Sequence, residues 1–485
     1  MGQNVNLLPR DILLRDTFTP AENLLFTTIL ITANLTFWLA DPRSYWLLGL
    51  FLIAGGMTVV ILKTHEATHP FFVNFLWPKF WLCTAPLWIL LMQYLVGIFQ
   101  DPVSTVRVGK EEFMHLEPVT SWLPISTGSQ STWTTMLGYC AVYLVTINLF
   151  IVPKSRAFFE RLLPWLCLSS VLVAIFGYIQ EGLTLSAPLF TDGTGQLDFF
   201  SCYPYDGHWA AFAIIWTCIN ISMSLLVSRY NDSPPFIEST GPWYLSGGIL
   251  LGSTAYLVEA RWPAALLMLT LSAMLMLVSM NFLIKIKDPN SRPISILTGL
   301  ASSAMFASAL ITIFQKPVHP MDRESLRQAA LDLFKESPLF GWGIDSFEIL
   351  LPLYGSDLLV GQNYERAEHD LFQFLSEVGL IGVAFPITLI LILIFRYVRG
   401  RHDIQLTNHL LIGCAVIVGL SFGDTPFMSP TVCFSFFTSL FIALRWADIT
   451  RNRADEVDAP RPTLVTPASK RRVPFHNKAS EYRFK

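Results

Sequence analysis

The chain has 485 residues, of which 52% are hydrophobic and only 14% are charged, and its formal net charge is −3. This composition is too apolar for an ordinary soluble domain and indicates an integral membrane protein. A slightly negative chain offers no basic field that would attract nucleic acid, so we expect no nucleic-acid partner.

Apolar blocks run from residue 23 to residue 446, which is therefore the predicted transmembrane domain. We predict an all-α, polytopic fold with about 12 transmembrane helices, from the length that a helix needs to cross a bilayer. The blocks are 23–40, 46–62, 80–99, 133–152, 163–180, 208–228, 243–258, 263–283, 294–314, 371–395, 408–422 and 428–446. Residues 1–22 and 447–485 lie outside them, and the polar composition of the tail predicts disorder.

Lysine and arginine are distributed unevenly between the loops. One set of loops contains Lys154, Arg156, Arg161, Lys285, Lys287, Arg292, Arg396, Arg399 and Arg401. The tail is also basic, whereas the loop 181–207 has no lysine or arginine. The positive-inside rule therefore places both termini in the cytoplasm. The outer loops are then 100–132, 181–207 and 315–370, and the last is too long for a simple connector.

Two patterns were considered as metal sites. The segment from His65 to His69 is a literal HExxH, in which two histidines one helical turn apart bind zinc in proteases. However, Pro70 should end the helix there, the segment lies at an inner loop, and no Asp-Gly segment supplies a third ligand. The seven cysteines occur singly, without metal spacing. We expect no metal and no cofactor, and a zinc protease is the minor alternative.

The most informative segment joins the polar stretch 315–370 to an apolar helix. His369 lies at this junction, and Gln373 and Glu377 follow at spacings that place all three on nearly one helix face. The dipole at a helix N-terminus disfavours a protonated imidazole, so His369 should be neutral and able to accept a proton. A general base is one interpretation, and an interfacial cap with Glu377 bonded to a neighbouring helix is the other.

Further arginines and glycines accompany this junction. Arg323 precedes a Pro-x-x-Gly-x-Gly turn that runs from Pro338 to Gly343, and Gly379 and Gly382 follow the histidine helix. Arg261 lies in a very short outer turn before another helix. Taken alone, an arginine at a helix end is more often an interfacial anchor.

In this order the motifs resemble those of the O-antigen ligase and polymerase superfamily, which are bacterial membrane glycosyltransferases. His369, Asp370, Gln373, Glu377, Gly379 and Gly382 match its histidine motif. Relatives carry a tryptophan shortly after the first arginine, where this chain has Arg327, so the pattern leaves two candidate arginines and we assign Arg323. The segment from Tyr203 to Trp209 matches poorly, and Asp424 resembles a family aspartate to which we assign a structural role.

The resemblance implies a protein of the bacterial inner membrane that transfers a glycan from a polyprenyl-pyrophosphate carrier on the periplasmic face. Arg261 and Arg323 would bind the donor pyrophosphate, His369 would be the catalytic base, and Gln373 and Glu377 would support it without a metal. The acceptor would be a glycan, lipid A core or a protein, which leaves ligase and polymerase, including exopolysaccharide polymerase, both open. A transporter is the alternative from another functional class.

Overall fold

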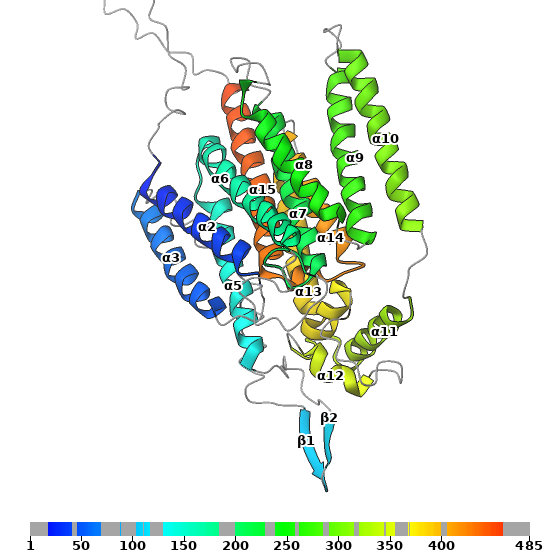
Figure 1. Ribbon diagram of the computed structural model, residues 1–485. Coiled ribbons are helices and arrows are strands. Elements are labelled where there is room, and N and C mark those ends of the chain that lie inside the picture. The colour runs from blue at the N-terminus through cyan, green and yellow to red at the C-terminus, as the bar shows by residue number, and fades with distance from the viewer. Residues whose placement is uncertain are drawn as a thin grey trace, which may run out of the picture.

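A computed structural model describes most of the chain (Figure 1). The described residues are 18–40, 46–68, 88, 103–109, 111–116, 130–183, 199–227, 238–257, 261–284, 291–314, 320–343, 346–354, 367, 369–398 and 405–458. The predicted helical class is confirmed, with one addition: an antiparallel β-hairpin of β1 (Val103–Val108) and β2 (Glu111–Leu116). The hairpin lies within the predicted outer loop 100–132, which carries no membrane-length apolar block.

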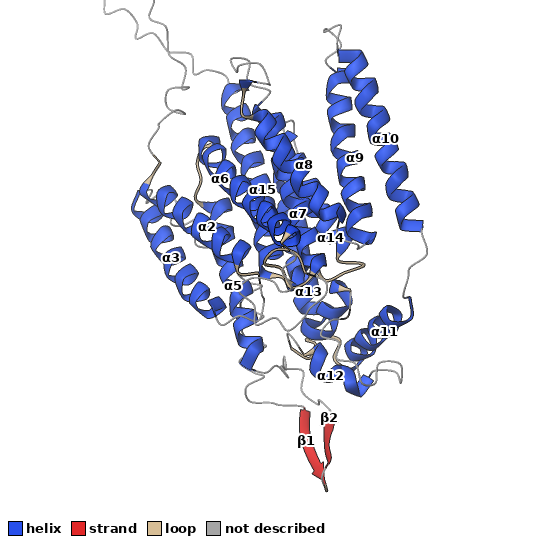
Figure 2. Ribbon diagram, viewed as in Figure 1, coloured by secondary structure: helices blue, strands red, loops and turns tan. Residues whose placement is uncertain are grey.

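The helices follow the predicted apolar blocks closely (Figure 2). They are α2 (Pro20–Trp38), α3 (Trp46–Thr68), α5 (Gln130–Ile151), α6 (Arg156–Gly182), α7 (Asp206–Val227), α8 (Gly241–Leu257), α9 (Arg261–Ile284), α10 (Ser291–Phe314), α11 (Pro320–Glu336), α12 (Phe347–Tyr354), α13 (Asp370–Val398), α14 (Gln405–Leu420), the short 3-10 helix η4 (Pro426–Met428) and α15 (Pro430–Asp458). The predicted block 80–99 lies almost wholly outside the described residues.

Six helices in the described part of the chain are long and apolar enough to cross a membrane. These spans are Arg156–Gly182, Asp206–Val227, Pro263–Met280, Ser295–Phe314, Asp370–Phe395 and Pro430–Thr450. Shorter apolar helices occur at Leu52–His65, Leu137–Ile151 and Leu406–Leu420. The chain is thus a membrane protein, and the number twelve stays a prediction.

The polar ends of the chain differ from the prediction in one respect. Helix α15 continues past Trp446 to Asp458, into the segment for which disorder was predicted. Arg445 lies one turn before this extension, donates to the Pro153 carbonyl oxygen at 2.7 Å and pairs with Asp448 at 2.7 Å, so polar contacts stabilise this end of the helix. Residues 459–485 lie outside the described part.

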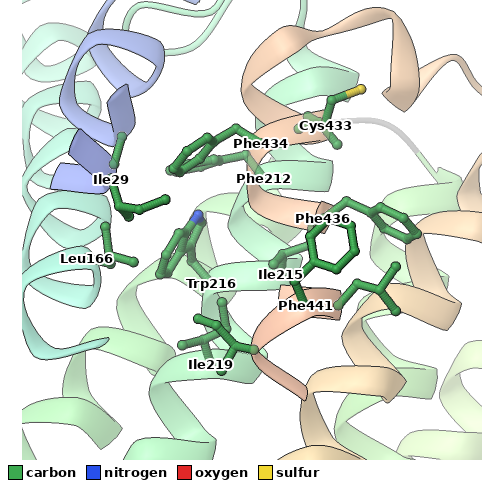
Figure 3. Packing of buried hydrophobic residues seen from close by; sticks show 14 of the residues in the cluster. Ile29, Leu166, Phe212, Ile215, Trp216, Ile219, Cys433, Phe434, Phe436 and Phe441 are labelled. Atoms are coloured by element: carbon green, nitrogen blue, oxygen red, sulfur yellow. The ribbon is translucent and has the colours of Figure 1, made fainter. Parts of the chain in front are cut away.

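The bundle core includes residues of α2, α5, α7 and α15 and combines aromatic with aliphatic side chains (Figure 3). Phe37 contacts Phe212, Trp216 and Phe434 with ring-centroid distances of 4.8, 5.3 and 6.0 Å. The rings meet edge to face, which is a favourable aromatic geometry. Trp216 also donates its indole N–H to Ser435 Oγ at 3.0 Å. Aromatic packing in this core is thus combined with a buried hydrogen bond between α7 and α15.

The predicted polar loop 315–370 is not one continuous loop, because it contains α11 and α12. The apolar residues of α11, Leu326, Ala329, Ala330 and Leu333, recur at helical spacing and are buried. Charged residues between them keep the helix too polar for a membrane span, so a search for apolar blocks misses it. With α12 and Trp342 these residues form a second hydrophobic cluster, separate from the bundle core. We call residues 320–354 the cap.

Figure 1 shows where the cap lies. Helices α11 and α12 and the β-hairpin all occupy the lower end of the molecule, near the start of α13, and α11 and α12 both contact α13. The end of α9, the start of α10 and the end of α15 lie at the opposite end. The described parts of the two longest predicted outer loops therefore lie at the same end of the bundle.

Candidate active site at the start of helix 13

His369 is the residue immediately before α13, and it is buried between aromatic rings. Its imidazole stacks on Phe372 with a centroid distance of 4.0 Å and an interplanar angle of 14°. Phe422, in the turn after α14, meets the imidazole edge to face at 5.8 Å and is itself 54% exposed. At the predicted junction between a polar segment and an apolar helix, the imidazole is thus flanked by two aromatic rings.

The hydrogen bonds of His369 define how its ring is held. The Phe372 backbone N–H donates to His369 Nδ1 at 3.4 Å, and the Gln373 N–H donates to the His369 carbonyl oxygen at 3.0 Å. His369 therefore caps the helix with its own side chain, as the cap interpretation expected. With Nδ1 accepting, the neutral ring carries its proton on Nε2.

The surroundings of His369 favour the neutral imidazole. Burial lowers its pKa below the usual 6.5, the positive charge of Arg327 lowers it further, and a backbone hydrogen bond raises it in part. Burial disfavours the charged form because the imidazolium loses its hydration. The direction agrees with the prediction from the helix N-terminus, although the named causes are burial and a neighbouring arginine.

Asp370 fastens the start of α13 to the turn that joins α14 to α15. Its backbone N–H donates to the carbonyl oxygens of Ser421 and Asp424, at 3.0 and 3.3 Å. Its carboxylate accepts from the Phe427 N–H at 2.9 Å. These bonds satisfy N–H groups that the starts of α13 and η4 leave without intrahelical partners. They also hold the position of His369 from its C-terminal side.

Gln373 and Glu377 lie on one face of α13, as the sequence predicted, and they are bonded to each other. Gln373 Nε2 donates to Glu377 Oε1 at 3.0 Å, and Gln373 Oε1 accepts from the Ala367 N–H at 3.1 Å. Both side chains are buried. The Gln373 amide therefore ties the segment before His369 to the helix after it.

Helix α13 is broken at Gly379, and the Pro338–Gly343 turn occupies the break. The Trp342 and Gly343 N–H groups donate to the carbonyl oxygens of Ser376 and Glu377, at 2.9 and 2.7 Å. In return, Leu380 and Ile381 donate to Pro338 and Leu339, at 2.9 and 3.1 Å. The backbone groups freed by the break are thus satisfied by the cap, which is how membrane proteins tolerate irregular helices.

Both glycines at this contact are required by geometry. Gly341 and Gly379 have φ of +69°, where side chains are strained. A Cβ on Gly341 would lie 2.4 Å from the Glu377 carbonyl group, and one on Gly379 would lie 2.4 Å from the Leu339 carbonyl group. The two backbones therefore approach closely enough to exclude any side chain, so the cap and α13 form one unit.

The two arginines assigned to the donor are placed by their backbones. Arg323 lies in the first half of α11 and Arg261 is the first residue of α9, and both side chains lie outside the described part. Near the start of α9, Leu266 lies 3.7 Å from the Cβ position of Gly419, close to the turn that carries Phe422. Arg261 and His369 thus belong to the same end of the bundle.

Arg327, which the sequence left as the second candidate, is an arginine whose charge acts on His369. It lies one helical turn after Arg323 on α11, and its charge contributes to the lowered pKa of His369. Its Nε atom is buried and has no hydrogen-bond partner among the described residues. The signal that could have identified it was the replacement of the family tryptophan by a cation.

A polar contact between α7 and the turn after α14 was not predicted. Tyr205 donates its hydroxyl to Asp424 Oδ1 at 2.8 Å, and His208 Nε2 lies 3.1 Å from the Thr425 carbonyl oxygen. Asp424 Oδ1 also accepts from the Thr425 N–H at 2.7 Å. Asp424 therefore joins the poorly matching Tyr203–Trp209 segment to the turn after α14. These bonds agree with the structural role assigned to Asp424.

The HExxH segment lies away from this site. His65 is buried near the end of α3, where Glu22 and Lys154 are among its charged neighbours. His69 lies outside the described residues. In the part of the chain that the structure describes, no group of three or more His, Cys, Asp or Glu residues is arranged to hold a metal ion.

Comparison with known proteins identifies one family. Residues 236–387 match the family model described as O-antigen ligase. The matched segment runs from just before α8 to the first half of α13, so it contains the cap, His369, Gln373, Glu377 and the arginines at positions 261, 323 and 327. No curated protein matches the chain.

Proposed function

We propose that this chain, whose residues 236–387 match the O-antigen ligase family model, transfers a polyprenyl-pyrophosphate-linked glycan to an acceptor hydroxyl at the cap end of the bundle. The observation that carries the proposal is the coincidence of the family match with a buried imidazole, held neutral, where the cap joins α13. Family resemblance alone supplies the reaction type, and this geometry supplies a residue for it.

The proposed donor is chosen by location. By the positive-inside rule the cap end faces the periplasm of a bacterial inner membrane, with both termini in the cytoplasm. Nucleotide sugars and ATP are absent there, so the sugar must arrive already activated on a lipid. A polyprenyl pyrophosphate is such a donor, and its lipid tail would remain in the bilayer while its head group reaches the cap.

The proposed reaction is a direct displacement. The acceptor oxygen attacks the anomeric carbon and gives its proton to His369, while the bond from that carbon to the phosphate oxygen breaks and its electron pair leaves with the pyrophosphate. Arg261 and Arg323 would stabilise the negative charge that develops on the leaving group. Attack opposite the leaving group inverts the anomeric carbon, and no metal takes part.

The ring position of His369 sets a condition on this role. In the resting geometry Nε2 carries the proton and can only donate, so base catalysis through Nε2 requires the proton to move to Nδ1. The cost is the long Phe372 N–H contact, about 0.5–1.5 kcal/mol for a hydrogen bond of ordinary strength. The rate enhancement of about 10²–10⁴ that a general base contributes outweighs this cost.

Gln373 and Glu377 support the proposed base rather than contact the substrate. The Gln373 amide holds Ala367 and Glu377 together, at 3.1 and 3.0 Å. Because Ala367 is two residues before His369, this bond limits how far the imidazole can move. Precise positioning of a base is what makes proton transfer efficient.

Ligase is the first choice of acceptor chemistry and polymerase is the second, because both use the same donor. The glycan left on the polyprenyl carrier in cells without this protein separates them. Accumulation of long chains beside unmodified lipid A core is the result expected for a ligase. Accumulation of single repeat units would instead identify a polymerase, of O-antigen or of an exopolysaccharide.

A transporter is the alternative from another class, and one assay tests it. Purified protein in vesicles would be supplied with the lipid-linked glycan and an acceptor on the same side of the membrane. Transfer without movement of the glycan across the bilayer supports the enzyme. Movement of the glycan across the bilayer with no transfer would overturn it.

A further inference from the structure

We propose that Arg327 is a third phosphate-binding residue, which binds the donor pyrophosphate together with Arg261 and Arg323 beside His369. The inference rests on the proposed function, because it names a further residue of the same donor site. It concerns a position where this chain departs from the motif that relatives share.

The first observation is a hydrogen-bond donor without an acceptor. Arg327 Nε is buried and has no partner among the described residues, while the side chain as a whole remains 26% exposed. A buried N–H that donates to nothing costs about 1–3 kcal/mol. The guanidinium therefore combines a buried donor that lacks an acceptor with an outer part that a ligand can reach.

The second observation is the neighbourhood of this donor. Leu326 and Ala330, on either side of Arg327 in α11, belong to the cluster against which Phe372 packs, and Phe372 stacks on His369. The charge of Arg327 is also felt at His369, whose pKa it helps to lower. Arg327 therefore lies near the imidazole, where it can contact the pyrophosphate of a donor whose anomeric carbon is bound beside His369.

The third observation is the spacing of the two arginines. Arg323 and Arg327 are four residues apart in α11, so they share one helix face and are separated by one turn. Two phosphates joined by one bridging oxygen offer several acceptor oxygens to such a pair. Arginine binds phosphate through two parallel N–H bonds, and that geometry distinguishes it from lysine.

The ion pair that Arg327 already makes does not explain why its Nε is buried without an acceptor. Its NH1 lies 4.0 Å from Glu324 Oε2, at the limit of an ion pair, and the Glu324 side chain is 79% exposed. Surface pairs of this kind contribute about 0–1 kcal/mol. Such a weak pair does not offset the cost of a buried donor that lacks an acceptor beside the imidazole.

Two substitutions separate the charge of Arg327 from its hydrogen bonds, with inorganic pyrophosphate as the probe. Arg327→Gln removes the charge, and Arg327→Lys keeps the charge but removes Nε and the planar fork. Lys335→Gln is the matched control, because Lys335 is a cation of the same helix, 66% exposed and paired with Asp332. Calorimetry on the full-length protein in nanodiscs measures pyrophosphate binding without requiring any transfer.

The glutamine variant should weaken pyrophosphate binding by about 10- to 100-fold, as expected for the loss of a charged hydrogen bond. The lysine variant should give an intermediate loss, and the Lys335 variant less than about twofold. In the transfer assay the glutamine variant should raise KM for the lipid donor by a similar factor.

The pH profile provides a readout that a purely structural role would not change. Charged groups on the elements packed around His369 are Arg327 on α11, Asp370 and Glu377 on α13, and Asp424 after α14. Removing the positive charge of Arg327 raises the pKa of His369, so transfer by the glutamine variant should decline at a higher pH than transfer by the wild type. The lysine variant should keep the wild-type profile.

Unchanged pyrophosphate binding and an unchanged pH profile in a folded Arg327→Gln variant would overturn the inference about Arg327. Absence of transfer by the wild-type protein, with normal pyrophosphate binding, would instead contradict the proposed function. The two failures are thus distinguishable in one set of measurements.

Discussion

The bundle core and the cap are built in different ways, although each contains one buried tryptophan whose indole N–H is hydrogen-bonded. In the bundle, Trp216 packs against Phe37 and Phe212 and donates to Ser435 Oγ at 3.0 Å. In the cap, Trp342 donates to the Leu333 carbonyl oxygen at 2.9 Å within a much smaller cluster. The bundle is held by apolar packing between many helices.

The cap depends instead on its backbone. Four hydrogen bonds of 2.7 to 3.1 Å join the Pro338–Gly343 turn to the break in α13. Two glycines make that approach possible. We therefore expect substitutions in the bundle to lower stability, whereas substitutions at the cap contact should lower activity first.

The largest effect is expected from filling the cap contact. Gly341→Ala adds a Cβ 2.4 Å from the Glu377 carbonyl group at a φ of +69°. Steric overlap and backbone strain together cost about 2–6 kcal/mol, which should separate the turn from α13 and reduce transfer by more than about 100-fold. Limited proteolysis of the cap and the transfer assay measure the two consequences.

Gly49→Ala is the matched control, since nothing lies within 4 Å of its Cβ position in α3. It should leave both measurements close to those of the wild type. Normal transfer by Gly341→Ala would break the comparison, because the cap would then not be positioned by this contact.

The two tryptophans provide the next largest effect and the most direct comparison. Replacing either with alanine removes a large buried side chain, at a cost of about 3–5 kcal/mol. Trp342→Ala should abolish most of the transfer while the bundle unfolds at nearly the wild-type temperature. Trp216→Ala should lower the unfolding temperature of the bundle. For both variants we would measure thermal unfolding in detergent, and transfer at temperatures below the unfolding transition. Equal losses of stability and of transfer in the two variants would show that the bundle and the cap are one cooperative unit.

A smaller effect is expected at Gln373. Gln373→Leu removes the bonds to Ala367 N and Glu377 Oε1 and leaves both groups buried. Transfer should fall by about tenfold, equivalent to about 1.4 kcal/mol, with little change in unfolding temperature. Gln328→Leu is the control, since Gln328 is exposed on α11 and bonds only Asp332. A Gln373 variant as active as this control would remove Gln373 from the supporting role.

The smallest effect is the pH dependence of the wild type. Because the pKa of His369 is lowered from 6.5, the imidazole stays neutral to a pH below that value. The midpoint of the decline in transfer on acidification should therefore lie below pH 6.5. A decline that begins well above pH 6.5 would show that the imidazole is not held neutral by burial and Arg327.

Much of the bundle could be predicted from the sequence, because its helices follow from hydropathy. Blocks such as 208–228 and 263–283 became α7 and α9 with small shifts of their ends. Gln373 and Glu377 were also placed correctly on one helix face, since helical spacing alone determines that.

The cap could not be predicted by the same reasoning. Helix α11 is too polar and α12 is too short to register as a membrane span. The hydrogen bonds that join the cap to α13 are made by backbone groups, which carry no side-chain signal. The glycines at 341 and 379 were visible in the sequence, but the pairing between them depends on tertiary contact. The role proposed for Arg327 likewise rests on a buried donor atom, which a pattern of residue types does not reveal.

The central claim is that His369 accepts the proton of the acceptor hydroxyl, and transfer by a His369→Ala variant tests it most directly. The purified variant would be reconstituted beside the wild type and Lys335→Gln, with unfolding temperature and pyrophosphate binding as measures of an intact fold and donor site. We predict a loss of about 10²–10⁴ in kcat with pyrophosphate binding unchanged. Full transfer by a well-folded His369→Ala variant would contradict the account.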